Sequence, residues 1–147
     1  MKKTNRLLSF TIVLTSIMLT TGCQSSQPKD GLFQQLGGLP GIERFVGIFI
    51  NEIGESKEIR PYFEETNLDR FREKQIEHIC LLSGGPCTYT GDSMIESHKG
   101  MGVNEADFNA LVDTTIRAMN KAGYSVATRN RLLARLAPLR DEVMEVK

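Results

Sequence analysis

The sequence predicts an all-α fold, on three observations. Apolar residues recur at intervals of three and four, the spacing that places side chains on one face of a helix. Alternating β-branched runs are few and no Asn-Gly turn occurs, so strand signals are weak. Glycines and prolines stand between the periodic segments, where they stop one helix and precede the next. A chain of 147 residues has room for one domain.

Four helical segments are expected in the first half of this domain. The first covers residues 32–36 and stops at a pair of glycines. The second, 42–54, has the clearest apolar stripe, and a short turn or helix follows over 57–63. A longer helix covers 68–83, with Asn67 as its N-cap, and a Gly-Gly-Pro run ends it.

The second half is expected to contain a long loop and two further helices. Residues 86–103 form the loop, interrupted by one helical turn at 94–98. Helices follow over 105–121 and 126–144, each preceded by an asparagine or serine that serves as an N-cap. Pro138 should bend the last helix because a proline inside a helix removes one backbone hydrogen bond.

Charge and motif content exclude several functional classes. Eighteen basic side chains match 18 acidic ones, but Lys2, Lys3 and Arg6 lie in an N-terminal segment without acids, and without them 15 basic residues remain. Such a balance does not favour nucleic acid, since binding a phosphate backbone requires clustered positive charge. Walker-type, HExxH, CxxC and GxSxG motifs do not occur.

The N-terminal residues are typical of an export signal. A basic start is followed by an apolar run over residues 7–19, which is shorter than the about 20 residues that cross a bilayer. Residues 19–23 (Leu-Thr-Thr-Gly-Cys) resemble a bacterial lipobox, in which the cysteine is lipidated and becomes the new N-terminus. An ordinary cleaved signal peptide or an uncleaved anchor remains the alternative.

This resemblance implies a division of the chain and a location. Residues 1–22 would be the signal peptide, 23–30 the lipidated N-terminus with a polar tether, and 31–147 the domain. Cys23 would anchor an exported lipoprotein in a membrane. Gln24 follows the cysteine in place of aspartate, which by analogy with lipoprotein sorting favours the periplasmic side of the outer membrane.

Export would leave Cys80 and Cys87 in an oxidising compartment. The Gly-Gly-Pro run between them allows a turn that brings the two sulfurs together, and a disulfide then forms if the Cα atoms lie within about 7 Å. The alternative is a buried Cys80 that packs as a small apolar residue, with Cys87 free in a loop. The spacing leaves both alternatives open.

Two polar side chains fall on or beside the apolar face of the 68–83 helix. That face is expected to run through Leu68, Phe71, Ile79 and Leu82, and it includes Gln75. His78 lies beside it. Either both side chains bond to backbone groups, or they face a ligand, because buried polar groups need hydrogen-bond partners.

The chain contains only two histidines, no CxxC and no carboxylate cluster, so an all-protein zinc or di-iron site is difficult to assemble. One imidazole suffices for haem, because the porphyrin supplies four nitrogens. His98, in a segment with glycines on both sides of Met101, is a candidate for such a ligand. Taken alone, a histidine beside lysine and glycine is more often an ordinary surface loop residue.

Several short segments occur in an order and spacing similar to that of group I truncated globins. The resemblance covers residues 32–143 and rests on these segments together: Leu36-Gly37-Gly38, Tyr62-Phe63, Arg72-Glu73-Lys74-Gln75, Gly84-Gly85-Pro86, Tyr89-Thr90-Gly91, Met94 with His98, Gly100-Met101-Gly102-Val103 and Leu136-Ala137-Pro138-Leu139. It implies a truncated globin fold, a two-over-two helical sandwich in which 42–54 and 68–83 pair against 105–121 and 126–144.

The resemblance also implies haem b (iron protoporphyrin IX) and its contacts. His98 would be the proximal ligand, with Nε2 on the iron. Phe63 would wedge against the haem, and Tyr89 and Met94 would line the proximal side. Arg70 and Lys74 would meet the propionates or solvent at the mouth of the pocket. Lys74 on a solvated helix face is the alternative.

The distal side departs from the family pattern. Phe49 is retained, but Ile50 stands where a tyrosine usually follows it, which removes the hydroxyl that most often donates to bound O₂. Phe71 occupies a position where some members carry a polar gate. Gln75 is then the best candidate donor to a ligand, and O₂ retention should be weaker than in relatives with the tyrosine.

His78 stands where the family usually carries a bulky apolar residue. Three roles are open for it: a hydrogen bond to a propionate, an inert part of the pocket wall, or a second axial ligand. Lys74 as a distal ligand is disfavoured because its ammonium would first have to lose a proton.

The function expected from this resemblance is oxygen binding and carriage, with NO or CO as other diatomic ligands. The alternative is an enzyme, a haem-dependent NO dioxygenase or a peroxidase-like detoxification protein. The missing distal tyrosine and the absence of a reductase domain from this sequence disfavour the enzyme. No redox partner is indicated.

Overall fold

A computed structural model describes residues 31–144, and this part of the chain contains helices and loops without a strand. The all-α prediction is therefore confirmed. The predicted signal peptide, the lipidated Cys23 and the tether lie outside the described residues. None of the helices within 31–144 has the length and apolar character needed to cross a membrane.

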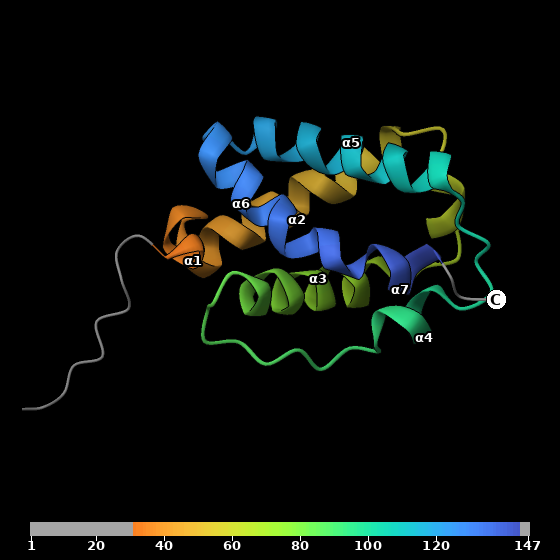
Figure 1. Cartoon of the computed structure of the whole chain (residues 1–147), viewed down its shortest axis with the longest axis horizontal. Coiled ribbons are helices and arrows are strands. Elements are labelled where there is room, and N and C mark those ends of the chain that lie inside the picture. The colour runs from red at the N-terminus through yellow and green to blue at the C-terminus, as the bar shows by residue number, and fades with distance from the viewer. Residues whose placement is uncertain (1–30, 145–147) are drawn as a thin grey trace, which may run out of the picture.

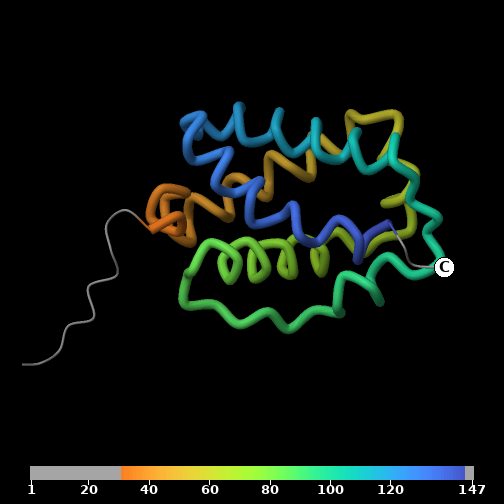
Figure 2. The backbone as a smooth tube through the Cα atoms, viewed as in Figure 1, coloured from red at the N-terminus to blue at the C-terminus, as the bar shows by residue number. Residues whose placement is uncertain are grey.

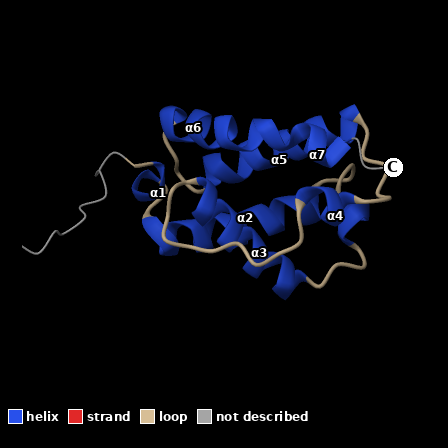
Figure 3. Ribbon diagram, turned by 60° about the horizontal axis from the view of Figure 1, so that its bottom comes forward, coloured by secondary structure: helices blue, strands red, loops and turns tan. Residues whose placement is uncertain are grey.

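The helices form two layers (Figure 3). The lower layer contains α2 (Gly38–Glu55) and α3 (Leu68–Leu82), and the upper layer contains α5 (Glu105–Lys121) and α6 (Val126–Leu136). Helix α2 packs against both α3 and α5, while α6 packs against α3. The shorter elements are α1 (Leu32–Gln35), η1 (Arg60–Phe63), α4 (Met94–His98), η2 (Ala137–Leu139) and α7 (Arg140–Met144). Helices α1 and α4 lie at opposite ends of the molecule (Figure 1).

Helix α2 begins at Gly38 instead of residue 42 as predicted from the apolar stripe. Gly37 adopts a left-handed conformation with φ of 86°, which ends α1 as expected and lets α2 start at the next residue. Pro40 then falls in the first turn, where its missing N–H has no helical partner to lose. The predicted start lay after this proline, but the proline belongs to the helix.

A close backbone approach joins α1 and α2. A Cβ atom on Gly41 would lie 1.9 Å from the carbonyl oxygen of Leu36, so only glycine fits there. The Tyr124 hydroxyl caps the same junction and lies 3.2 Å from the carbonyl oxygen of Leu36 and 3.1 Å from that of Gly41. Burial raises the pKa of Tyr124 to about 12, so the hydroxyl remains a donor.

The predicted helix over 126–144 is broken into three pieces. Helix α6 ends at Leu136, the 3₁₀ turn η2 contains Pro138, and α7 resumes at Arg140. Pro138 has no N–H to bond to an earlier carbonyl, which favours the tighter 3₁₀ turn at this point. The predicted disturbance at Pro138 is confirmed, but the α-helix is interrupted there by a 3₁₀ turn and does not run on through the proline.

The predicted N-caps are confirmed where the sequence placed them. Asn67 accepts a hydrogen bond from the Arg70 N–H at 3.0 Å. Asn104 forms a reciprocal capping box with Asp107 at the start of α5, and the Ser125 side chain accepts from the Thr128 N–H. These bonds fix where α3, α5 and α6 begin, independently of the core.

The core lies between α2, α5 and α6. Its largest fully buried side chains include Phe45, Leu36, Ile42, Met119 and Leu132. The expected apolar face of α3 is wrong at Leu68, which is 49% exposed, because this first residue of α3 lies beyond the end of the core. Ile79, later on α3, is buried as predicted.

After α3, the chain turns back and runs beside it toward α4 (Figure 2). A disulfide joins Cys80 of α3 to Cys87 of this loop, with the two Cα atoms 5.8 Å apart. The first of the two alternatives for these cysteines is the one that the structure contains. Gly85 makes room for it, since a Cβ there would lie 2.6 Å from the Cys80 sulfur.

Candidate functional site

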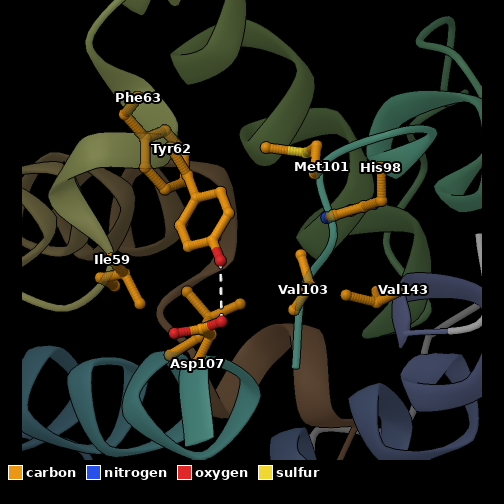
Figure 4. A pocket seen from close by; sticks show the side chains of 9 residues that line it. Ile59, Tyr62, Phe63, His98, Met101, Val103, Asp107 and Val143 are labelled. Carbon is orange, nitrogen blue, oxygen red and sulfur yellow. Dashed lines mark hydrogen bonds between the residues drawn. The ribbon is translucent and has the colours of Figure 1, made fainter. Parts of the chain in front are cut away.

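A cavity opens between η1, α5, α7 and the segment that follows α4 (Figure 4). Its empty space is about 350 Å³, part of it open to solvent. The side chains that line it are mostly apolar: Ile59, Tyr62, Phe63, His98, Met101, Val103, Asp107, Leu111 and Val143. Such apolar hollows with a few polar groups are typical of ligand sites.

His98 reaches this cavity from the last residue of α4. Its Nδ1 lies 2.7 Å from the carbonyl oxygen of Met94, one helical turn earlier. A carbonyl oxygen can only accept, so Nδ1 carries the proton and donates. In the neutral ring the lone pair is then on Nε2. A histidine held in this way by a backbone carbonyl is oriented as a metal ligand.

Opposite His98, the Tyr62 hydroxyl donates to Asp107 Oδ2 over 2.7 Å (Figure 4). The same carboxylate accepts from the Asn104 N–H, so the capping box of α5 holds it in place. The hydrogen bond to Asp107, with burial second, raises the pKa of Tyr62. This pair fixes η1 against α5 and forms a polar edge of an otherwise apolar cavity.

Of the predicted site residues, Phe63 and His98 line the cavity. Phe71 on α3 packs edge-on against Phe63, with ring centroids 5.0 Å apart, so it lies directly behind the wall. The other predicted residues do not line it: Phe49, Ile50, Arg70, Lys74, Gln75, His78, Tyr89 and Met94. Contact of these residues with haem remains a prediction.

The distal candidates lie on the inner sides of α2 and α3. Phe49 is buried and stacks with Phe45 at a centroid distance of 6.1 Å, while Ile50 packs at the edge of the core. Gln75 is partly exposed, and its amide has no hydrogen-bond partner within residues 31–144. An amide without a protein partner is available to donate to a ligand.

His78 is 8% exposed and packs beside Tyr89, with ring centroids 5.1 Å apart. Burial lowers the pKa of His78, although the carboxylate of Glu142 on α7 opposes this, so the ring is neutral near pH 7. Burial is also the main cause that raises the pKa of Tyr89. The three roles predicted for His78 remain predictions.

Arg70 and Lys74 are engaged with the protein itself. Arg70 forms an ion pair with Asp92 at 3.6 Å. The ammonium of Lys74 lies 2.8 Å from Glu73, 3.1 Å from Glu77 and 2.6 Å from the Thr90 hydroxyl. Glu73, ahead of Glu77, raises the pKa of Lys74, which makes proton loss harder. Contact with a propionate remains a prediction for both.

No group of three or more His, Cys, Asp or Glu side chains within residues 31–144 is placed to hold a metal ion. Apart from Tyr62 and Asp107, which are bonded to each other at its edge, the cavity presents one imidazole among apolar side chains. This set suits a flat, largely apolar cofactor that brings the rest of its metal's ligands, and haem is such a group. The residues present therefore fit haem better than a bare ion.

Sequence reasoning missed most of the cavity wall. Tyr62, Met101 and Val103 were recognised within short motifs but were not assigned to the site. The available signals were the position of Tyr62 next to Phe63 and the position of Met101 and Val103 in the glycine-containing run after His98. Asp107, Leu111 and Val143 gave none, because helical periodicity does not say which apolar face borders a cavity and which borders the core.

This protein has two helical layers and a mostly apolar cavity that one imidazole enters. It therefore belongs to the class of all-helical proteins with a site suited to a flat cofactor. A family model described as "Bacterial-like globin" matches residues 31–145. The chain belongs to this bacterial-like globin family.

Relatives by sequence are group 1 truncated hemoglobins. That of Tetrahymena thermophila is 29% identical over 94 residues, which are 64% of this chain and 78% of the relative. That of Mycolicibacterium paratuberculosis is 29% identical over 112 residues, 76% of this chain and 82% of the relative. The chain therefore spans most of the length of both.

Solved structures of truncated hemoglobins share the fold. The Fe(III) form of truncated hemoglobin from Tetrahymena pyriformis superposes with a TM-score of 0.74 at 24% identity, covering 77% of this chain and 97% of the other. The 2/2 hemoglobin from Synechococcus sp., solved in the cyanomet state with covalently attached heme, gives a TM-score of 0.73 at 17% identity and covers 78% and 98%. The predicted two-over-two globin fold is confirmed.

Proposed function

We propose that this globin binds haem b through His98 and carries diatomic gases, with O₂ as the first candidate ligand and NO or CO as others. The observation that carries the proposal is the 2.7 Å contact between Nδ1 of His98 and the carbonyl oxygen of Met94 beside an apolar cavity. That contact leaves the lone pair of Nε2 directed away from Met94 and available to bind iron. Family membership and the heme named for the Synechococcus relative support the same conclusion.

When bound, haem iron would supply a coordination position for a diatomic molecule. The chain's residues supply the surroundings. Phe63, Met101 and Val103 provide an apolar surface beside His98. On the other side, the amide of Gln75 is the available hydrogen-bond donor, while Ile50 offers none.

Reversible carriage is favoured over NO dioxygenation or peroxide chemistry by this distal side. An apolar Ile50 where the family usually has tyrosine leaves one neutral amide to retain O₂, and such a hydrogen bond contributes only about 1–2 kcal/mol. Mixing the O₂-loaded protein with NO tests the choice. A single stoichiometric reaction supports a carrier, whereas repeated turnover with an added electron donor supports the enzyme.

The haem proposal is tested by one spectrum. Protein purified with hemin should show a Soret band, and the reduced protein should shift on addition of CO if a coordination position is accessible. Protein that emerges colourless after hemin is supplied contradicts the proposal. A reduced spectrum unchanged by CO contradicts gas binding and leaves haem binding in place.

We also propose that the protein is exported and anchored through lipid on Cys23, at the periplasmic side of the outer membrane. The basic start, the apolar run over residues 7–19 and the lipobox-like residues 19–23 support this. The described chain starts beside α1, at the end of the molecule away from α4 (Figure 1). Mass spectrometry of the membrane-extracted N-terminal peptide tests it, and a Cys23→Ser variant should leave the membrane fraction.

A further inference from the structure

The loop over residues 84–93, here called the strap, is attached to α3 along its whole length (Figure 2). The attachments follow one another in antiparallel order: Cys87 to Cys80, Tyr89 to His78, Thr90 to Glu77 and Lys74, and Asp92 to Arg70. A loop without secondary structure therefore has a defined path. This path ends at α4, which carries His98.

Glu77 is the centre of this attachment. One carboxylate oxygen, Oε2, accepts from the Thr90 N–H at 2.9 Å and from its hydroxyl at 2.9 Å. The other oxygen, Oε1, accepts from the Lys74 ammonium at 3.1 Å. The side chains of Glu77 and Lys74 are only 22% and 14% exposed, whereas that of Glu73, the other partner of Lys74, is 62% exposed. Glu77 holds the backbone of the strap, and Glu73 does not.

Hydrogen bonds within the chain hold the strap between Thr90 and α4. The Tyr89 hydroxyl donates to the carbonyl oxygen of Asp92 over 2.7 Å. Gly91 allows this closure, since a Cβ there would lie 2.4 Å from the Tyr89 hydroxyl oxygen. Ser93 then caps α4 by accepting from the Glu96 N–H at 3.1 Å. Each step from Thr90 to the first turn of α4 is thus fixed by a bond.

We propose that Glu77 is a positioning residue for His98, acting through Thr90 and the strap that leads into α4. This inference rests on the proposed function, in which His98 holds the haem. Phe71 and Gln75 stand on α3 itself, while His98 is the last residue of α4, which follows the strap. Glu77 therefore sets the separation between the helix that carries the distal residues and the turn that carries the iron ligand.

The experiment compares Glu77→Gln with Glu73→Gln in the full chain. Both variants remove one negative charge beside Lys74, but only the first weakens the bonds to Thr90. Amide hydrogen exchange over residues 90–98 should rise on the order of tenfold in E77Q, with or without haem, and stay near wild type in E73Q. Haem transfer to excess apomyoglobin should be on the order of fivefold faster in E77Q alone.

The iron–histidine vibration of the reduced protein gives a readout that general destabilisation would not move. It should shift or broaden in E77Q and remain unchanged in E73Q. Thr90→Val should repeat the E77Q result, because it removes the hydroxyl that Glu77 binds, and Thr90→Ser should restore the wild-type values. Thr90 is exposed, so these two variants test the proposal even if E77Q does not fold.

Equal exchange and equal haem transfer in E77Q and E73Q would overturn the positioning role. The same holds if Thr90→Val behaves as wild type. Faster exchange at 90–98 in E77Q, when the wild type itself takes up no haem, would instead overturn the haem assignment, while it upholds the control of α4 by Glu77. The two failures are therefore distinguishable.

Discussion

Nδ1 of His98 is bonded to the carbonyl oxygen of Met94 within the single turn of α4. A helix of five residues would not by itself fix a side chain, because so short a helix is marginal. Here the ring has one orientation since the Met94 carbonyl of its own turn accepts a hydrogen bond from Nδ1. The site thus depends on a local bond and not only on packing around the cavity.

Replacement of this ligand provides the first test. A His98→Ala variant should retain no haem after hemin reconstitution, because the porphyrin iron loses its only protein donor at the cavity. The matched control is His78→Ala, which removes the other histidine of the chain and should keep the Soret band. If H98A retained a normal Soret band and H78A lost it, the ligand would be assigned to the wrong histidine.

The second prediction concerns Gln75. A Gln75→Leu variant should release O₂ about five- to thirtyfold faster, the effect of losing one hydrogen bond of about 1–2 kcal/mol in a dry pocket. Stopped-flow displacement of O₂ by CO measures this rate. Gln34→Leu, at an exposed position on α1, is the control and should leave the rate unchanged. An unchanged rate in Q75L would mean that another group, or none, donates to the ligand.

Most of the fold was predictable from local signals. Caps such as Asn104 and stops such as Gly37 are written in neighbouring residues, so they were found from the sequence. The main errors in helix bounds concern prolines. Pro40 belongs to a helix start that the apolar stripe cannot mark, and Pro138 ends a helix that the stripe continues through. In both cases backbone hydrogen bonding decided the boundary and hydrophobic periodicity did not.

The candidate site was less predictable. His98 and Phe63 were expected in it and line the cavity, since each lies in a short recognisable segment. The Tyr62–Asp107 bond joins residues 45 positions apart, and periodicity carries no information about such pairs. The contact of Lys74 with Thr90 was missed for a related reason: sequence spacing shows that Glu73 and Glu77 are near Lys74, but not that a returning loop brings Thr90 to the same point.

The third prediction concerns the Cys80–Cys87 disulfide. It closes a small loop, for which restriction of the unfolded chain is worth about 2.5 kcal/mol. Cys87→Ser should therefore lower the free energy of unfolding by an amount of that order, measured by urea denaturation. Reductant should destabilise the wild type to the same extent and have no effect on C87S. If reductant destabilised both proteins equally, the stabilisation would not come from this disulfide.

The fourth prediction concerns Glu52, whose side chain is 3% exposed on α2 and pairs with Lys121 and Arg117 of α5. The hydrogen bond from Lys121 outweighs burial and lowers the pKa of Glu52 below its ordinary value of 4.5. Unfolding therefore raises the proton affinity of this carboxylate. Its stabilisation is complete above the unfolded pKa and is lost as pH falls through the lower folded pKa.

Glu52→Gln should accordingly cost about 1–2 kcal/mol at pH 7, a moderate effect because both cations are about half exposed and regain water. The difference between E52Q and wild type should shrink as the pH is lowered below 4.5. Urea denaturation at several pH values measures it, with exposed Glu55→Gln as the control. A difference that stays constant down to the acid limit would show that packing of Glu52, and not its charge, is what stabilises α2 against α5.

The last prediction uses two glycines of α2 that differ only in their surroundings. A Cβ atom on Gly41 would lie 1.9 Å from the carbonyl oxygen of Leu36, while a Cβ atom on Gly54 would meet nothing within 4 Å. Gly41→Ala should destabilise the protein by about 3 kcal/mol or more, because the α1–α2 junction must open and the Tyr124 hydroxyl then loses its two carbonyl partners. Gly54→Ala should be neutral or stabilise by up to about 1 kcal/mol, since alanine restricts the unfolded chain and favours helix.

Thermal unfolding of both variants measures the difference. Equal effects would mean that the close approach of Leu36 to Gly41 is not maintained in solution, and α1 would then not be fixed to α2 by this junction.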